Sequence, residues 1–120
     1  TIVDRIGIPI GGPGVDLETG TASFTFKIPS AFDVDEVYAS VATAAVGSAI
    51  TVDINEGGVS ILSTVITIDA GEKGTDTAAT PPVISDASLA AYAEITIDID
   101  QVGSTTAGQE LMVWLIDTVD

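Results

Sequence analysis

The chain has no cysteine and no histidine among its 120 residues, and its only cations are Arg5, Lys27 and Lys73. Without these side chains, disulfides, haem ligation, the usual zinc sites and Cys or His catalysis are excluded. Eighteen acidic residues against three cations give a net charge of −15. Nucleic acids and anionic membranes both need clustered Lys or Arg on the protein that binds them. We therefore expect no nucleic acid, no membrane and no cofactor.

Long apolar runs are also missing from the chain. The longest covers residues 111–116, whereas a membrane-spanning helix needs about 20 apolar residues. No basic segment followed by an apolar one opens the sequence, so no secretory signal is expected. The length suits one domain, and the 46% of apolar residues are enough to build its core.

The chain is rich in β-branched residues, with 15 Ile, 13 Val and 15 Thr. These residue types favour pleated strands, and no window repeats its apolar residues at helical spacing. Several segments instead alternate between apolar and polar residues, which is typical of a strand with one buried face. We predict such strands at 21–29, 37–43, 50–54 and 94–102.

Turn residues separate these segments at regular intervals. The run Asn55-Glu56-Gly57-Gly58 lies between two β segments and predicts a hairpin. Residues 110–116 are apolar on both faces, which predicts a central strand covered on both sides. Together, seven or eight short strands predict an all-β fold. We expect a two-sheet antiparallel β-sandwich with Greek-key connections, of jelly-roll or immunoglobulin-like type.

The first twenty residues differ from the rest because glycine and proline are concentrated there. This density excludes a central strand and predicts an extended N-terminal arm over 1–20, followed by one sandwich domain over 21–120. Such an arm could add a strand to the sheet edge of a neighbouring molecule. We expect partner contacts at Ile6, Ile8, Pro9, Ile10 and Pro13 of the arm and at Trp114 of the two-sided strand.

Three aspartates could carry chemistry. Asp98 and Asp100 lie two apart on one strand, so their side chains share a face about 7 Å apart, and Asp53 could join them from another strand. Such carboxylates suit a Ca²⁺ site or glycoside hydrolysis, and the acidic loop 33–36 is another possible Ca²⁺ site. Catalytic carboxylates need a concave, partly dry pocket, whereas interleaved threonines indicate a solvated face. We therefore predict no enzyme and no metal, with these three aspartates as weak metal candidates.

The middle of the chain carries a family resemblance. The order VDINEGG (52–58), ILST (61–64) and TIDAGEK (67–73), then PPVI (81–84) and AEITIDIDQVG (93–103), resembles a β-sandwich module of tailed-bacteriophage and prophage structural proteins. Such modules occur in capsid decoration, head-fibre, tail and fibre proteins. The resemblance covers roughly residues 21–117 and brings no catalytic residues with it.

The resemblance implies a virion structural protein, first of all a capsid decoration (cement) protein on the outer surface of the particle. Such a protein would bind the major capsid protein, stabilise the shell and form a homo-oligomer, with a trimer favoured. The alternative is a tail, baseplate or fibre module that binds host surface glycans through an exposed aromatic side chain and a concave groove. A hydrolase that uses Asp53, Asp98 and Asp100 is the third hypothesis.

Overall fold

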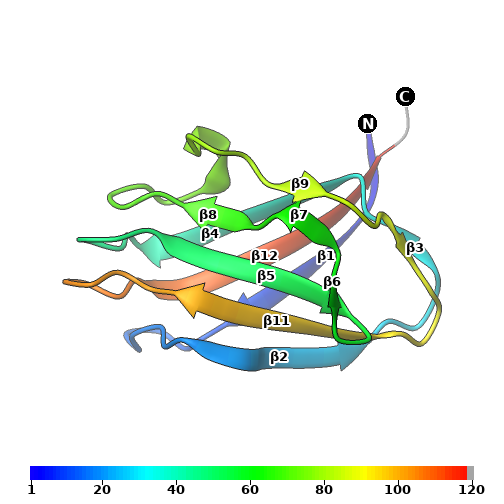
Figure 1. The fold of residues 1–120 in the computed structure, drawn as a ribbon, viewed down its shortest axis with the longest axis horizontal. Coiled ribbons are helices and arrows are strands. Elements are labelled where there is room, and N and C mark those ends of the chain that lie inside the picture. Colours follow the sequence, from blue (N-terminus) through cyan, green and yellow to red (C-terminus); the bar gives the residue numbers. More distant parts are fainter. Residues whose placement is uncertain (119–120) are drawn as a thin grey trace.

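The computed structural model describes residues 1–118, which form an all-β, sandwich-like fold (Figure 1). The predicted fold class is therefore confirmed at this level. Residues 119 and 120, the end of the predicted domain 21–120, lie outside the described residues. The strands are β1 (Ile2–Ile10), β2 (Gly20–Lys27), β3 (Phe32–Asp33), β4 (Glu36–Thr43), β5 (Ile50–Glu56), β6 (Val59–Ser60), β7 (Leu62–Thr64), β8 (Ile66–Ile68), β9 (Val83–Ile84), β10 (Ser88–Leu89), β11 (Glu94–Gln101) and β12 (Gln109–Thr118), with a 3-10 turn, η1 (Thr75–Thr77), between β8 and β9.

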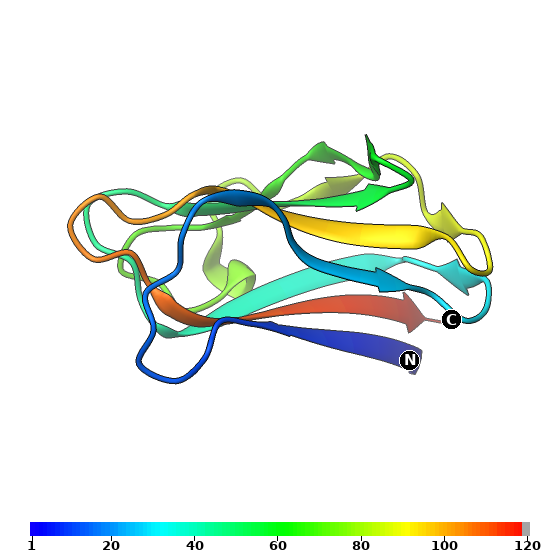
Figure 2. The same cartoon turned by 90° about the horizontal axis from the view of Figure 1, so that it is seen from below.

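The long strands form two layers (Figure 2). One sheet has the order β1-β12-β4, and the other has the order β2-β11-β5-β8, with β6 folded back against the end of β5. All of these neighbours are antiparallel. The short pairs β10-β3 and β7-β9 form two small ladders of their own. No helix among residues 1–118 is long and apolar enough to cross a membrane.

The predicted alternation places the core between the two layers. In β11, for example, Ile95, Ile97 and Ile99 are buried, while Thr96 and Asp98 are only half-buried on the opposite face. Each fully buried side chain of this size contributes about 1.5–3 kcal/mol. The largest fully buried side chains are Ile8, Ile28, Ile50, Ile54, Ile61, Ile66, Ile68, Leu89, Ile95, Ile97, Leu111 and Leu115.

The predicted hairpin after β5 is confirmed. Glu56 pairs with Val59 across a two-residue turn formed by Gly57 and Gly58. Both glycines have positive φ, +58° and +86°, as a type I′ turn requires.

The N-terminal segment differs from the prediction of an arm separate from the sandwich. Residues 2–10 form β1, which pairs with β12 along its length, and Ile8 and Ile10 are 2% and 6% exposed. The isoleucines at 6, 8 and 10 alternate with Gly7 and Pro9, so their apolar side chains all point toward the core. Proline is compatible with this position because β1 is an edge strand. The loop that follows, residues 11–19, contains the glycine-rich run.

The central position predicted for residues 110–116 is confirmed, because β12 lies between β1 and β4. The predicted cover on both sides is wrong. Leu111, Val113 and Leu115 are buried, but Trp114 and Ile116 on the other face are only half-buried. A two-layer sandwich covers each sheet on one face only, so the second apolar face of β12 points away from the core.

Candidate interaction surface

The face of the β1-β12-β4 sheet that points away from the core is apolar along its central strand. The antiparallel register aligns its residues in rows that run across the three strands. Residues next to these in sequence, such as Ile8, Val113 and Ala39, are buried on the opposite side. The outer face, as we call it below, consists of the rows Pro9–Met112–Ser40, Gly7–Trp114–Tyr38 and Arg5–Ile116–Glu36.

Trp114 lies over Gly7 on the neighbouring strand. A Cβ atom added to Gly7 would lie 2.7 Å from Cζ3 and 2.9 Å from Cη2 of the indole ring. The ring therefore occupies the space that any larger residue at position 7 would need. The absence of a side chain on β1 lets Trp114 lean across the sheet surface instead of standing away from it.

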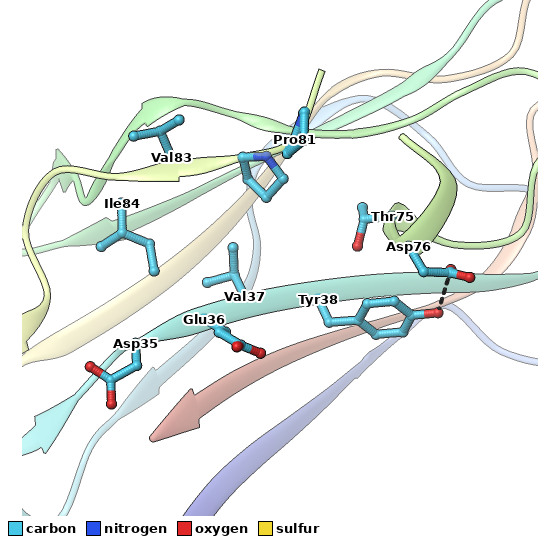
Figure 3. Close-up of a pocket in the computed structure, with 10 residues that line it drawn as sticks. Asp35, Glu36, Val37, Tyr38, Thr75, Asp76, Pro81, Val83 and Ile84 are labelled. Carbon is cyan, nitrogen blue, oxygen red and sulfur yellow. Dashed lines mark hydrogen bonds between the residues drawn. The ribbon is translucent and has the colours of Figure 1, made fainter. Parts of the chain in front are cut away.

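Tyr38 also lies over a glycine, but it leans in the other direction, toward Gly74 beside the far edge of β4. Its ring and hydroxyl lie against Gly74, and the hydroxyl donates a hydrogen bond of 2.9 Å to Asp76 Oδ1 (Figure 3). This bond, together with burial and the charge of Asp76, raises the pKa of Tyr38. The bond holds the Tyr38 ring away from the centre of the outer face.

A hollow of about 280 Å³ lies on the outer face. It is lined by Ile2, Arg5, Tyr38, Trp114 and Ile116. Most of this lining is apolar or aromatic, and Arg5 adds one of the three cations of a chain with net charge −15. An apolar hollow with one cation suits a protein side chain better than a metal ion or a phosphate.

The free edge beside this face is poorly suited to strand addition. Pro9 has no backbone N–H, and the N–H of Arg5 already donates to Asp4 Oδ1 at 2.8 Å. Missing donors and charged side chains are common means by which edge strands avoid pairing with other chains. Contacts through the outer face are therefore favoured over contacts through the edge of β1.

The predicted partner contacts are divided between core and surface. Trp114 and the exposed Pro9 belong to the outer face, and Pro13 is exposed in the loop after β1. The prediction is wrong for Ile8 and Ile10, which are buried in the core of their own chain, and Ile6 is partly buried against that core. The error arose because an isolated arm exposes all of its side chains, whereas a paired strand buries every second one.

A second hollow, a groove of about 490 Å³, runs beside β4 on the side away from β12 (Figure 3). Toward the C-terminal end of β4 this edge is closed, since the N–H groups of Ala39 and Val41 donate to Thr75 Oγ1 and to the Lys73 carbonyl. The groove lies beside the N-terminal end of β4, and its lining contains carboxylates but no cation. Its lining residues are Asp35, Glu36, Val37, Tyr38, Thr75, Asp76, Pro81, Pro82, Val83 and Ile84.

The three candidate aspartates lie near one another on the outside of the second sheet but do not form a metal site. Asp53 and Asp98 are register partners, and the charges of both raise the pKa of Asp100, for which burial is the larger cause. Within residues 1–118, no group of three acidic side chains is arranged to hold a metal ion. Asp98 instead accepts hydrogen bonds from the Ala22 N–H at 2.7 Å and from Asn55 Nδ2 at 2.9 Å.

Several other carboxylates also accept hydrogen bonds from the backbone of distant segments. Glu56 accepts from the N–H of Ala90 at 2.8 Å, and Asp69 accepts from the N–H of Ala79 at 2.9 Å. The sequence indicated only a solvated face for the three candidate aspartates and did not predict this role for the acidic residues. Its one local signal is the placement of acids next to turns, which does not identify the donor.

Asp35, which lies between β3 and β4 and contacts the end of β12, shows the same use of a carboxylate. It accepts hydrogen bonds from the backbone N–H and the hydroxyl of Thr118 at 2.8 and 3.2 Å. The backbone bond is the main reason why the pKa of Asp35 is lowered. The neighbouring Asp117 has a raised pKa because of burial first and then its nearness to Asp35 and other acids.

Comparison with known proteins gave no relative that could identify this surface. No protein-family model matches the chain. No curated protein matches it. No solved structure matches it.

Proposed function

We propose that this chain is a structural protein of a bacteriophage virion, a decoration protein that binds the outer surface of the capsid and stabilises the shell. We assign its fold to the jelly-roll class, which is found in viral capsid proteins and lectins. The single observation that carries the proposal is the order of the strands in the two sheets. The sequence resemblance to tailed-phage structural modules points the same way.

The strand order supports this assignment. A jelly roll has eight strands, with the first, eighth, third and sixth in one sheet and the second, seventh, fourth and fifth in the other. The corresponding strands here are β1, β12 and β4 in one sheet and β2, β11, β5 and β8 in the other. The sixth position is filled by the segment around Gly74, which bridges to Ser40 of β4.

The proposed partner is the major capsid protein together with other copies of the decoration protein. The N-terminal segment is already paired with β12 in its own chain, so strand addition by a free arm is not part of the proposal. The outer face and the acidic groove beside β4 are the surfaces that we propose for these contacts. The net charge of −15 keeps such a layer from adhering to the nucleic acid inside the shell.

Binding to shells tests this function. Purified protein would be added to capsids that lack it, and bound copies would be counted after sedimentation of the particles. We expect hundreds of copies per particle, on the order of the number of capsid subunits, and higher resistance of the loaded shells to heat. Shells that neither bind the protein nor gain heat resistance would overturn the proposal.

A glycan-binding module of the tail or fibre is the second candidate. The observation that favours it is that Trp114 and Tyr38 both line the hollow of the outer face, since aromatic rings beside a concavity can stack on sugars. Ile2 and Ile116 occupy much of the same lining and offer no hydrogen bond to a hydroxyl group. A glycan array in which Trp114→Ala abolishes binding would support this candidate, and an array without any binding would exclude it.

A further inference from the structure

We infer that the outer face is a contact between two copies of this chain, which pack face to face about a two-fold axis parallel to β12. The inference rests on the proposed function for its biological setting, as the partner is a second copy within the same layer. Its test uses the purified chain alone, so it can fail while shell binding succeeds. An interface of this kind is isologous and closes at two copies, so the expected trimer would need another surface.

Charge complementarity favours this packing. Arg5 on β1 and Glu36 on β4 lie at opposite ends of one row, with Ile116 between them. Rotation about an axis along β12 lays β4 of the second copy over β1 of the first. Arg5 then faces Glu36 of the second copy, and the same pair forms again on the other side. Within residues 1–118 neither side chain has another ion-pair or hydrogen-bond partner that would compete.

The centre of this contact is apolar. The Trp114 ring lies over β1, and the hollow beside it is lined by Ile2 and Arg5 of β1, Trp114 and Ile116 of β12 and Tyr38 of β4. The same rotation brings the two β12 strands face to face. Each copy therefore contributes Met112, Trp114 and Ile116 to the middle of the contact. Burial of these apolar groups, with the charges at the rim, is the usual arrangement of a protein interface.

The size of the outer face and the charge of the two copies limit the strength of this contact. The outer face covers a stretch of about five residues on each of three strands, and the strands are spaced about 4.8 Å apart, which gives a footprint of about 250 Å². This area is small beside the roughly 800 Å² per partner of a standard interface. The charge of −15 on each copy also opposes association. We therefore expect a weak dimer with a dissociation constant on the order of 100 µM, which a dense layer of copies on a particle would favour.

Sedimentation velocity of the purified chain from about 5 to 500 µM, in about 0.15 M NaCl, tests the inference. The key variant is Glu36→Arg, which lowers the net negative charge but places a cation opposite Arg5 of the second copy. Glu18→Arg is the matched control, because it makes the same charge change at an exposed position in the loop after β1. Circular dichroism would check that each variant is folded.

We expect dimerisation of the wild-type chain, and a dissociation constant raised by about tenfold in Glu36→Arg, since like charges opposite one another are costly. Glu18→Arg would dimerise as well as the wild type or better. Arg5→Glu would weaken the dimer, and the double variant with Arg5→Glu and Glu36→Arg would restore it at the wild-type net charge. A monomer at every concentration, equal effects of the two charge-matched variants, or no restoration in the double variant would each overturn the inference.

Discussion

Replacing Gly7 with alanine tests how the outer face is built. The added methyl group would lie 2.7 Å from Cζ3 and 2.9 Å from Cη2 of Trp114, closer than carbon atoms approach without strain. Because Gly7 lies within a regular strand and has no positive φ, alanine fits the backbone. The effect on stability therefore depends on the ring.

Two opposing contributions set the size of the effect. Overpacking of a well-fitted contact costs about 1–3 kcal/mol. Replacing glycine with alanine at a compatible backbone position stabilises the folded state by about 0.4–1 kcal/mol, because the unfolded chain loses conformational freedom. The clash is the larger contribution, so we expect a net loss of about 1 kcal/mol. For a domain of this size that corresponds to a melting temperature lower by roughly 4 °C.

The assay uses Trp114 itself, which is the single tryptophan of the chain. In Gly7→Ala the indole ring must move outward, so its fluorescence emission should shift to longer wavelength in dilute solution. The matched control is Gly12→Ala, whose new Cβ would meet only Val15 Cγ2, at 3.9 Å. The control should keep the wild-type emission and melting temperature, or melt slightly higher.

A Gly7→Ala variant with unchanged emission and a melting temperature raised as much as in Gly12→Ala would contradict this prediction. That result would mean that Trp114 does not rest on β1. The hollow on the outer face would then have a different shape.

Three further outcomes are expected. Asp98→Ala should lower the free energy of unfolding in urea by about 2 kcal/mol, because the Ala22 N–H and Asn55 Nδ2 lose their charged acceptor. Asp98→Asn keeps an acceptor and should cost less. Equal losses of stability in the two variants would contradict this role of Asp98. Asp100→Asn should raise the melting temperature at pH 7 but not at pH 3. The pKa of Asp100 is raised, so the folded state holds the proton of this carboxyl group more tightly than the unfolded state does. The free energy of unfolding of the wild type therefore falls as the pH rises above 3.8, and asparagine removes this loss. The melting temperature of the wild type should rise between low and molar NaCl, because salt screens the repulsion within a chain of net charge −15, and a flat profile would speak against it.

The local elements were predictable because their signals are local. Alternation with a period of two residues identified the strands and their buried faces, as in Ile95, Ile97 and Ile99. Two glycines after Glu56 identified the hairpin, since both turn positions need positive φ. The central place of residues 110–116 also followed from their composition.

Prediction failed where proline and glycine were taken as a sign of a detached segment. Pro9 does exclude a central position, but it does not exclude an edge strand, and the alternation of Ile6, Ile8 and Ile10 was the stronger signal. Pairing also changes which residues can meet a partner, because it turns Ile8 and Ile10 into the core. Of the predicted interface, Trp114, Pro9 and Pro13 remain accessible.

The all-β class, the hairpin after β5 and the absence of Cys and His chemistry were predictable, because they depend on composition and on neighbouring residues. Which strands pair is visible only in the folded chain. Ile10 lies opposite Leu111, and Asp98 accepts from the Ala22 N–H, although long stretches of chain separate the members of each pair. The physical reason is that strand partners and register are fixed by burial summed over the whole core. The same summed burial aligned Arg5 with Glu36 and left Trp114 on an outer face.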